Sequence, residues 1–156
     1  MAKQASKEDT TLRLTRTFAA PREKVFKAWT DPQELKRWFA PSDDYATPLA
    51  EVDLRVGGKY RIQMKAPDGE CYTVVGTYRV VQPPAKLVFT WAWEGGGCDG
   101  GAQQTENEML VTVEFLERGR STELVLTHEM FLDAAQRDRH REGWTGCLTR
   151  LEKVVA

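Results

Sequence analysis

Residues 133–155 read DAAQRDRHREGWTGCLTRLEKVV, and this stretch decides the fold. Its apolar side chains recur at the i, i+3, i+4 and i+7 spacing that lines up one face of an α-helix. The sequence therefore predicts one long amphipathic helix at the end of the chain. The predicted stripe consists of His140, Trp144, Cys147, Leu148, Leu151 and Val155.

Most of the chain before this helix alternates apolar with polar residues, the pattern of half-buried β-strands. Glycine and proline mark most of the short segments between them, which is typical of hairpin turns and therefore of antiparallel neighbours. Because a single helix has to cover so many strands, we predict an α+β fold in which the helix lies in the concave side of a curved sheet and leaves a pocket there. The predicted strands span residues 11–18, 49–55, 58–66, 71–82, 86–94, 107–117 and 122–130.

Two short helices are predicted between the first two strands. Pro21 suits the first turn of one helix, because its missing N–H is not needed there. Asp31 is placed to cap the other helix, and Glu34, three residues later, is placed to return the bond to the cap. Pro41 ends that helix, and residues 41–48 are predicted to be a loop.

Length and charge exclude several classes of protein. At 156 residues the chain fits one domain, predicted over residues 11–156 after a frayed segment of residues 1–10. With 22 basic and 23 acidic residues it has no field that would attract nucleic acid. No apolar run is long enough for a membrane span, and residues 1–10 lack the apolar core of a signal peptide. The predicted location is the cytosol.

The cysteines point away from metal and redox chemistry. Cys71, Cys98 and Cys147 are odd in number, far apart and without a C-x-x-C motif, so we predict three free thiols, with Cys147 as an apolar filler. Gly95–Gly100 (GGGCDG) fits G-x-G-x-x-G, but no helix follows to hold a pyrophosphate. We interpret it as a flexible hairpin loop, with gating of the pocket as the alternative. No cofactor and no metal are predicted.

The inward residues of the strands and of the helix give the predicted lining of the pocket. For each of them the alternative is a plain core position. As a set they favour an apolar cavity with few oriented polar groups, the usual character of a ligand site. The predicted lining is Tyr60, Met64, Tyr78, Trp91, Met109, Met130, Trp144, Leu148 and Leu151, together with the two histidines.

The two histidines are the sharpest polar features. His128 shares the inward face of its strand, and His140 lies one turn before Trp144 on the helix stripe. Either of them is able to orient a ligand or to move a proton near neutral pH. The alternative is that each bonds a backbone carbonyl or lies at the wet rim of the pocket. Two histidines without a nearby carboxylate or thiolate do not make a metal site.

Arg16 falls on the inward face of the first strand, where an unpaired charge is unfavourable. We predict a structural ion pair, for which Glu114 and Asp53 are candidate partners. A clamp on a ligand carboxylate is the alternative.

Two further features belong to the long helix. Gly143 and Gly146 each weaken it by about 1 kcal/mol relative to alanine, so their presence predicts close approach of a neighbouring backbone. Arg137, Arg139 and Arg141 alternate with acidic residues, which predicts a solvated face.

Four segments carry a resemblance to a known family: RTFAAPREKVFKAWTDPQELKRW (16–38), DLRVGGKY (53–60), GTYRVVQPPAKLVFTW (76–91) and GWTGCLTRL (143–151). The chain resembles the bacterial branch of the START-like (SRPBCC) superfamily, in the group similar to the C-terminal domain of the activator of the ninety-kilodalton heat-shock chaperone's ATPase. The resemblance covers residues 11–155 in order. It implies a helix-grip fold, a curved antiparallel sheet of six or seven strands around a C-terminal helix.

The resemblance leaves the activity open, because one such scaffold serves several functions. The leading hypothesis is non-catalytic binding of a small apolar or amphipathic molecule between sheet and helix. The first alternative is an enzyme of cyclase or hydrolase type that uses His128 or His140. The second is a chaperone cofactor that acts by protein–protein contact. Neither a nucleic-acid partner nor a particular oligomeric state is predicted.

Overall fold

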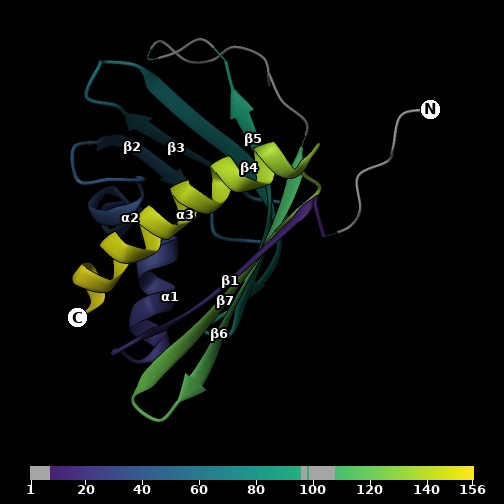
Figure 1. Cartoon of the computed structure of the whole chain (residues 1–156). Helices are drawn as coiled ribbons and strands as arrows, with labels where there is room; N and C mark the ends of the chain where they lie inside the picture. The colour runs from purple at the N-terminus through teal and green to yellow at the C-terminus, as the bar shows by residue number, and fades with distance from the viewer. Residues whose placement is uncertain (1–7, 96–97, 99–107) are drawn as a thin grey trace.

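The computed structural model describes residues 8–95, 98 and 108–156. Within these residues it contains one seven-stranded antiparallel sheet, in the order β1-β7-β6-β5-β4-β3-β2, and three helices on one side of the sheet (Figure 1). The predicted fold class and helix-grip architecture are confirmed. The strands are β1 (Thr11–Phe18), β2 (Ala46–Val52), β3 (Lys59–Lys65), β4 (Cys71–Gln82), β5 (Lys86–Glu94), β6 (Met109–Arg118) and β7 (Ser121–Glu129), and the helices are α1 (Arg22–Thr30), α2 (Pro32–Trp38) and α3 (Ala134–Val155).

The sheet order places the first strand beside the last strand. Strands β2 to β7 are joined as consecutive antiparallel neighbours, whereas β1 pairs with β7, with Leu12 opposite His128 and Phe18 opposite Thr122. Helix α3 then crosses the sheet face diagonally, and α1 and α2 lie beneath its C-terminal half (Figure 1). The core is therefore enclosed between one sheet face and three helices.

Helix α3 buries five of the six residues in the stripe that its spacing predicts, and the sixth, His140, is partly buried. Trp144, Cys147, Leu148, Leu151 and Val155 are all buried. The helix begins after Asp133, whose side chain accepts a 2.8 Å hydrogen bond from the backbone N–H of Gln136. The spacing did not reveal that Gln136 is buried as well, where its side-chain oxygen accepts from the backbone N–H of Leu132 at 2.8 Å.

The first strand after the short helices begins earlier than predicted. The sequence places a strand at 49–55 after a loop, but β2 spans Ala46–Val52 and includes Pro48. Proline has no N–H to donate, and this is tolerated because β2 is the last strand at one edge of the sheet. The pairing of β2 with β3 also shifts register between Ala46 and Leu49, beside the proline.

The cap of α2 is formed only in part as predicted. The Asp31 carboxylate accepts from the backbone N–H of Gln33 at 2.9 Å. Its own N–H, however, donates to the carbonyl of Lys27 at 2.9 Å, so α1 already satisfies it. Glu34 pairs instead with Arg37 at 3.2 Å, and the predicted return bond to the cap is wrong.

Arg16 forms a structural ion pair, but with neither of the predicted partners. Its guanidinium contacts the carboxylate of Glu152 at 2.9 Å and the hydroxyl of Thr149 at 3.0 Å, both on α3. The side chain points from β1 toward the last turns of this helix. Asp53 pairs with its neighbour Arg55 at 2.9 Å. The ion pair therefore joins the first strand to the last helix.

The two glycines of α3 lie in opposite surroundings. A β-carbon built on Gly146 would collide with the backbone carbonyl of Pro41, so the helix and the loop after α2 touch backbone to backbone, as predicted. A β-carbon on Gly143 would meet nothing within 4 Å. The prediction of close backbone approach is wrong for Gly143, which faces open space.

The frayed N-terminus predicted over residues 1–10 lies largely outside the described residues, which begin at residue 8. Residues 8–10 are attached to the rest of the fold. Arg137 donates to the carbonyl of Glu8 at 2.8 Å, and the N–H of Phe131 donates to the carbonyl of Thr10 at 3.1 Å. The Arg137 side chain is only 16% exposed, so the prediction of a solvated position is wrong for it.

Candidate ligand pocket

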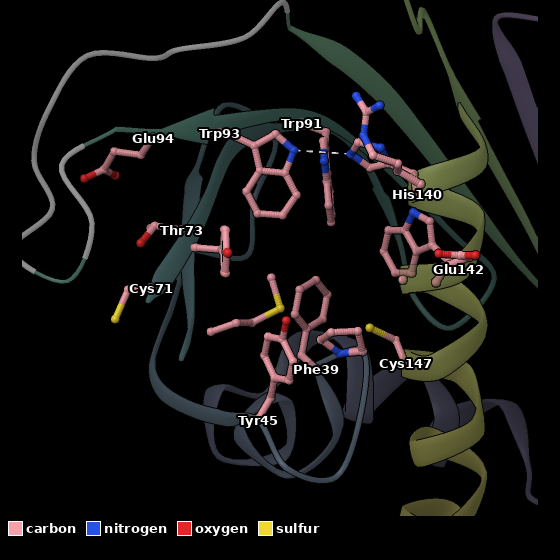
Figure 2. A pocket seen from close by; sticks show the side chains of 16 residues that line it. Phe39, Tyr45, Cys71, Thr73, Trp91, Trp93, Glu94, His140, Glu142 and Cys147 are labelled. Atoms are coloured by element: carbon pink, nitrogen blue, oxygen red, sulfur yellow. Dashed lines mark hydrogen bonds between the residues drawn. The ribbon is translucent and has the colours of Figure 1, made fainter. Parts of the chain in front are cut away.

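A pocket of about 700 Å³ opens between α3, the loop after α2 and the strands β3, β4 and β5 (Figure 2). Its volume falls within the range of about 300–1,000 Å³ typical of small-molecule sites. Its surface is mainly apolar. The lining residues are Phe39, Pro41, Tyr45, Met64, Cys71, Tyr72, Thr73, Trp91, Trp93, Glu94, Arg139, His140, Glu142, Gly143, Trp144 and Cys147.

Four of the predicted lining residues meet in this pocket: Met64, Trp91, His140 and Trp144. They come from β3, β5 and α3, three elements that are separate in the sequence. Tyr60 and Tyr78 face a second, much smaller cavity that Trp91 also lines.

The other predicted residues do not reach the pocket. Met109, Leu148, Leu151 and His128 are buried in the core and belong to the packing between helix and sheet. Met130 is placed wrongly by the alternation pattern: it is 57% exposed and has a φ of 75°. Strand β7 ends at Glu129, and the chain turns there toward α3. Met130 therefore lies beyond the strand and does not continue its series of inward-facing side chains.

Several lining residues were not predicted from the sequence. Trp93 follows the same alternation as Trp91, so a signal for it was present. Tyr45 comes from the loop before β2, where no periodicity indicates a direction. Arg139 and Glu142 line the pocket, although the charge pattern of the helix predicts a solvated face for this segment. Both are exposed and belong to its polar rim.

His128 is buried and held by the long helix. Its Nδ1 accepts a 3.0 Å hydrogen bond from the indole N–H of Trp144, so a neutral ring carries its proton on Nε2. That nitrogen finds no hydrogen-bond partner among the described residues. Burial, and secondarily the nearby His140, hold the pKa of His128 well below its usual range. The ring is therefore neutral at physiological pH and does not line the pocket.

His140 uses both ring nitrogens within the protein. Its Nε2 accepts from the indole N–H of Trp93 at 3.2 Å (Figure 2). The neutral ring therefore carries its proton on Nδ1, which lies 2.9 Å from the carbonyl of Gln136. The predicted alternative of a backbone carbonyl partner therefore holds for His140. Because Trp93 occupies Nε2, this nitrogen accepts a proton from a ligand only after that hydrogen bond is broken.

The buried charge in the pocket wall is neutralised locally. Glu94 ends β5 with a side chain that is only 9% exposed, and it accepts two hydrogen bonds from Arg61 of β3, at 2.9 and 3.0 Å. Such a two-point arginine–carboxylate pair is geometrically specific and holds both groups in place. The wall therefore presents a fixed, paired carboxylate.

The prediction of three free thiols is wrong. Cys71 and Cys98 form a disulfide with a Cα–Cα distance of 4.9 Å, and Cys71 lines the pocket. Antiparallel pairing of β4 with β5 brings the start of one strand close to the residues that follow the other, which spacing along the chain does not reveal. Of the predicted glycine-rich loop over residues 95–100, only residues 95 and 98 are described, and the remainder lies outside the described residues.

Cys147 is a free thiol, buried against the pocket. Burial raises its pKa to about 12. The thiol is therefore protonated and behaves as the apolar filler that the helix stripe predicts.

The pKa of His128 predicts how stability depends on pH. The ring has a folded pKa lowered from 6.5, so an unfolded chain takes up a proton below about pH 6.5 that the folded chain does not. The free energy of unfolding should therefore fall as pH decreases below about 6.5, by up to about 1.4 kcal/mol per pH unit.

His128→Asn keeps an acceptor near Trp144 but does not titrate. Chemical unfolding of both proteins between pH 7.5 and 5 checks the prediction, with the variant expected to show the shallower slope. Equal slopes for the two proteins would contradict it.

Two features are absent from the part of the chain that the structure describes. No three His, Cys, Asp or Glu side chains come together as a metal site there. Neither does any described helix have the length and apolarity needed to cross a membrane.

Comparison with known proteins identifies a family match and several solved structures with a similar fold. A family model described as "Activator of Hsp90 ATPase homolog 1-like protein" matches residues 19–156. The crystal structure of the AHSA1 protein from Silicibacter pomeroyi is 30% identical with a TM-score of 0.77, covering 92% of this chain and 95% of that one.

Two further solved structures are similar. A Chromobacterium violaceum protein is 27% identical with a TM-score of 0.79, covering 94% of this chain and 96% of its own. The AHSA1-like protein from Aeromonas hydrophila is 27% identical with a TM-score of 0.71, covering 92% of both chains. Among proteins with curated descriptions, none matches this chain significantly.

Proposed function

Because this chain belongs to the Activator of Hsp90 ATPase homolog 1-like family, we propose that it uses the family fold to bind a small apolar or amphipathic molecule without catalysis. The observation that carries this proposal is the open pocket of about 700 Å³ between α3 and the sheet. A well-formed apolar pocket with a few polar groups is the general form of a ligand site. We place this activity in the cytosol.

The arrangement of polar groups supports binding rather than chemistry. Glu94 is paired with Arg61, and both ring nitrogens of His140 are within hydrogen-bond distance of protein groups. His128 does not line the pocket, and the Cys147 thiol is protonated. A bound molecule would therefore meet mostly satisfied polar groups and apolar walls.

Gly143→Phe tests the proposal directly, because Gly143 lines the pocket and has open space above its α-carbon. A phenyl ring there should fill part of the cavity, while replacing glycine in the helix should not weaken the fold. We expect binding of the apolar dye anilinonaphthalene sulfonate, measured by the rise in its fluorescence, to weaken at least about tenfold, or about 1.4 kcal/mol.

Thr145→Phe provides the matched control. It introduces the same ring on the exposed face of the same helix, away from the pocket. This variant should bind the dye as the wild-type protein does. No dye binding by the wild-type protein, or equal loss in both variants, would defeat the proposal.

A second candidate function is stimulation of an Hsp90-type chaperone ATPase, which the description of the family favours. It requires contact through the protein surface and not through the pocket. The ATPase rate of the chaperone, measured with and without this protein, distinguishes the two. A stimulated rate that Gly143→Phe leaves unchanged would support the chaperone function.

A further inference from the structure

The lining of the pocket has an unusual composition for an apolar site. None of its described residues is leucine, isoleucine or valine. Such side chains fill the rest of the core, as at Leu12, Val111 and Leu126, so the two parts of the interior are chemically distinct. The pocket instead contains seven side chains with aromatic rings: Phe39, Tyr45, Tyr72, Trp91, Trp93, His140 and Trp144.

Five of these rings, those of Phe39, Trp91, Trp93, His140 and Trp144, form a continuous wall that presents both faces and edges. Trp91 lies 5.0 Å from Trp144 between ring centroids at an interplanar angle of 44°, and 5.6 Å from Trp93 at 89°. Phe39 meets Trp144 edge to face at 5.8 Å. Across the space, Trp93 and Tyr45 point toward one another from different sides (Figure 2).

Two features hold this wall in place. The hydrogen bond from Trp93 to His140 joins β5 to α3, and the Arg61–Glu94 pair fixes the end of β5 beside it. Aromatic side chains also have few rotatable bonds, so their positions are well defined when packed. The aromatic wall is therefore rigid.

Resting on the proposed function, we infer that the pocket prefers a flat, conjugated fused-ring molecule with polar substituents over an alkyl chain. Aromatic pairs in stacked or edge-to-face contact contribute about 0.5–1.5 kcal/mol beyond the area they bury. An alkyl chain gains only the free energy of burying its apolar surface. It also loses conformational entropy when it is held against rigid walls. Two or three additional ring contacts therefore correspond to about tenfold or more in affinity.

Polar groups in the pocket fit substituents on such a ring system. A tyrosine hydroxyl is protonated near neutral pH, and burial raises the pKa of Tyr45 further. The buried Thr73 hydroxyl lies in the same lining. Arg139 adds a cation at the rim. Hydroxyl, keto or carboxylate oxygens at the edge of a flat ligand would find donors there.

Two probes with the same number of carbons and the same head group separate the classes: anthracene-2-carboxylic acid and pentadecanoic acid. Calorimetric titration of each into the wild-type protein, below the micelle concentration of the fatty acid, should show at least about tenfold tighter binding of the anthracene acid. Equal or tighter binding of the fatty acid would overturn this inference and leave the proposed function standing. Binding of neither acid would overturn both.

Two substitutions of Trp93 test whether the ring itself is responsible. Trp93→Phe and Trp93→Leu both remove the hydrogen bond to His140, but only Trp93→Phe keeps an aromatic ring. The phenylalanine variant should retain the preference for the anthracene acid, and the leucine variant should lose at least about threefold of it. The same loss in both variants would show that the hydrogen bond, and not the ring, sets the preference.

Discussion

Gly146→Ala is expected to lower the free energy of unfolding by up to about 2 kcal/mol, although alanine favours helices. The added methyl group would collide with the backbone carbonyl of Pro41, and a backbone cannot move aside as the end of a side chain can. Overpacking of this kind destabilises by about 1–3 kcal/mol. The gain in helix propensity offsets about 1 kcal/mol of it. Gly146→Leu should be worse, because its larger side chain meets the same obstacle.

Gly143→Ala provides the control, because it makes the same chemical change three residues earlier in the same helix. No atom lies within 4 Å of the new methyl group. This variant should therefore be stabilised by about 1 kcal/mol. Urea unfolding of the three proteins measures both effects. Equal stability of the two alanine variants would show that α3 and the loop after α2 do not meet as described.

Removal of the Cys71–Cys98 disulfide should have the second large effect. The two cysteines are separated by 27 positions, and a cross-link closing a loop of this length stabilises a fold by about 3 kcal/mol in the chain-entropy description. For a protein of this size the melting temperature should fall by about 6–12 °C in Cys71→Ser. Differential scanning calorimetry with and without reductant measures the change.

Two control experiments, reductant treatment and cysteine alkylation, test the disulfide prediction. Reductant should lower the stability of the wild-type protein to that of Cys71→Ser and should not affect the variant. Under denaturing, non-reducing conditions, alkylation followed by mass spectrometry should label Cys147 alone, the one free thiol among the described residues. Labelling of all three cysteines would contradict the structure and would show that the protein has three free thiols, as their spacing in the sequence predicts.

The fold could be predicted because its signals are local and repeated. Alternation identifies each strand, and the spacing of Trp144, Leu148 and Leu151 identifies the buried face of α3. The errors occur where a non-local feature decides the outcome. Pro48 is accepted in β2 because the strand lies at a sheet edge, and the partner of Arg16 depends on where α3 ends in space. Neither the edge position of β2 nor the place where α3 ends can be predicted from the residues next to Pro48 or Arg16.

The pocket was predicted less well for the same reason. Alternation tells which face of a strand is buried but not which part of that face lies under a helix, so Met109 and Tyr60 could not be distinguished from Met64 and Trp91. Cys71 and Cys98 meet only because β4 and β5 pair in one register. The tautomers of the two histidines likewise depend on indole partners that come from distant parts of the chain.

The pairing of β1 with β7 also has a consequence for biosynthesis. The ribosome delivers β7 more than a hundred residues after β1, as the pairing of Leu12 with His128 shows, and α3 follows β7. Until α3 has been synthesised, the nascent polypeptide exposes the part of the apolar sheet face that this helix covers in the folded protein. Self-association of incomplete chains is therefore a hazard that this topology leaves to the cell's quality-control machinery.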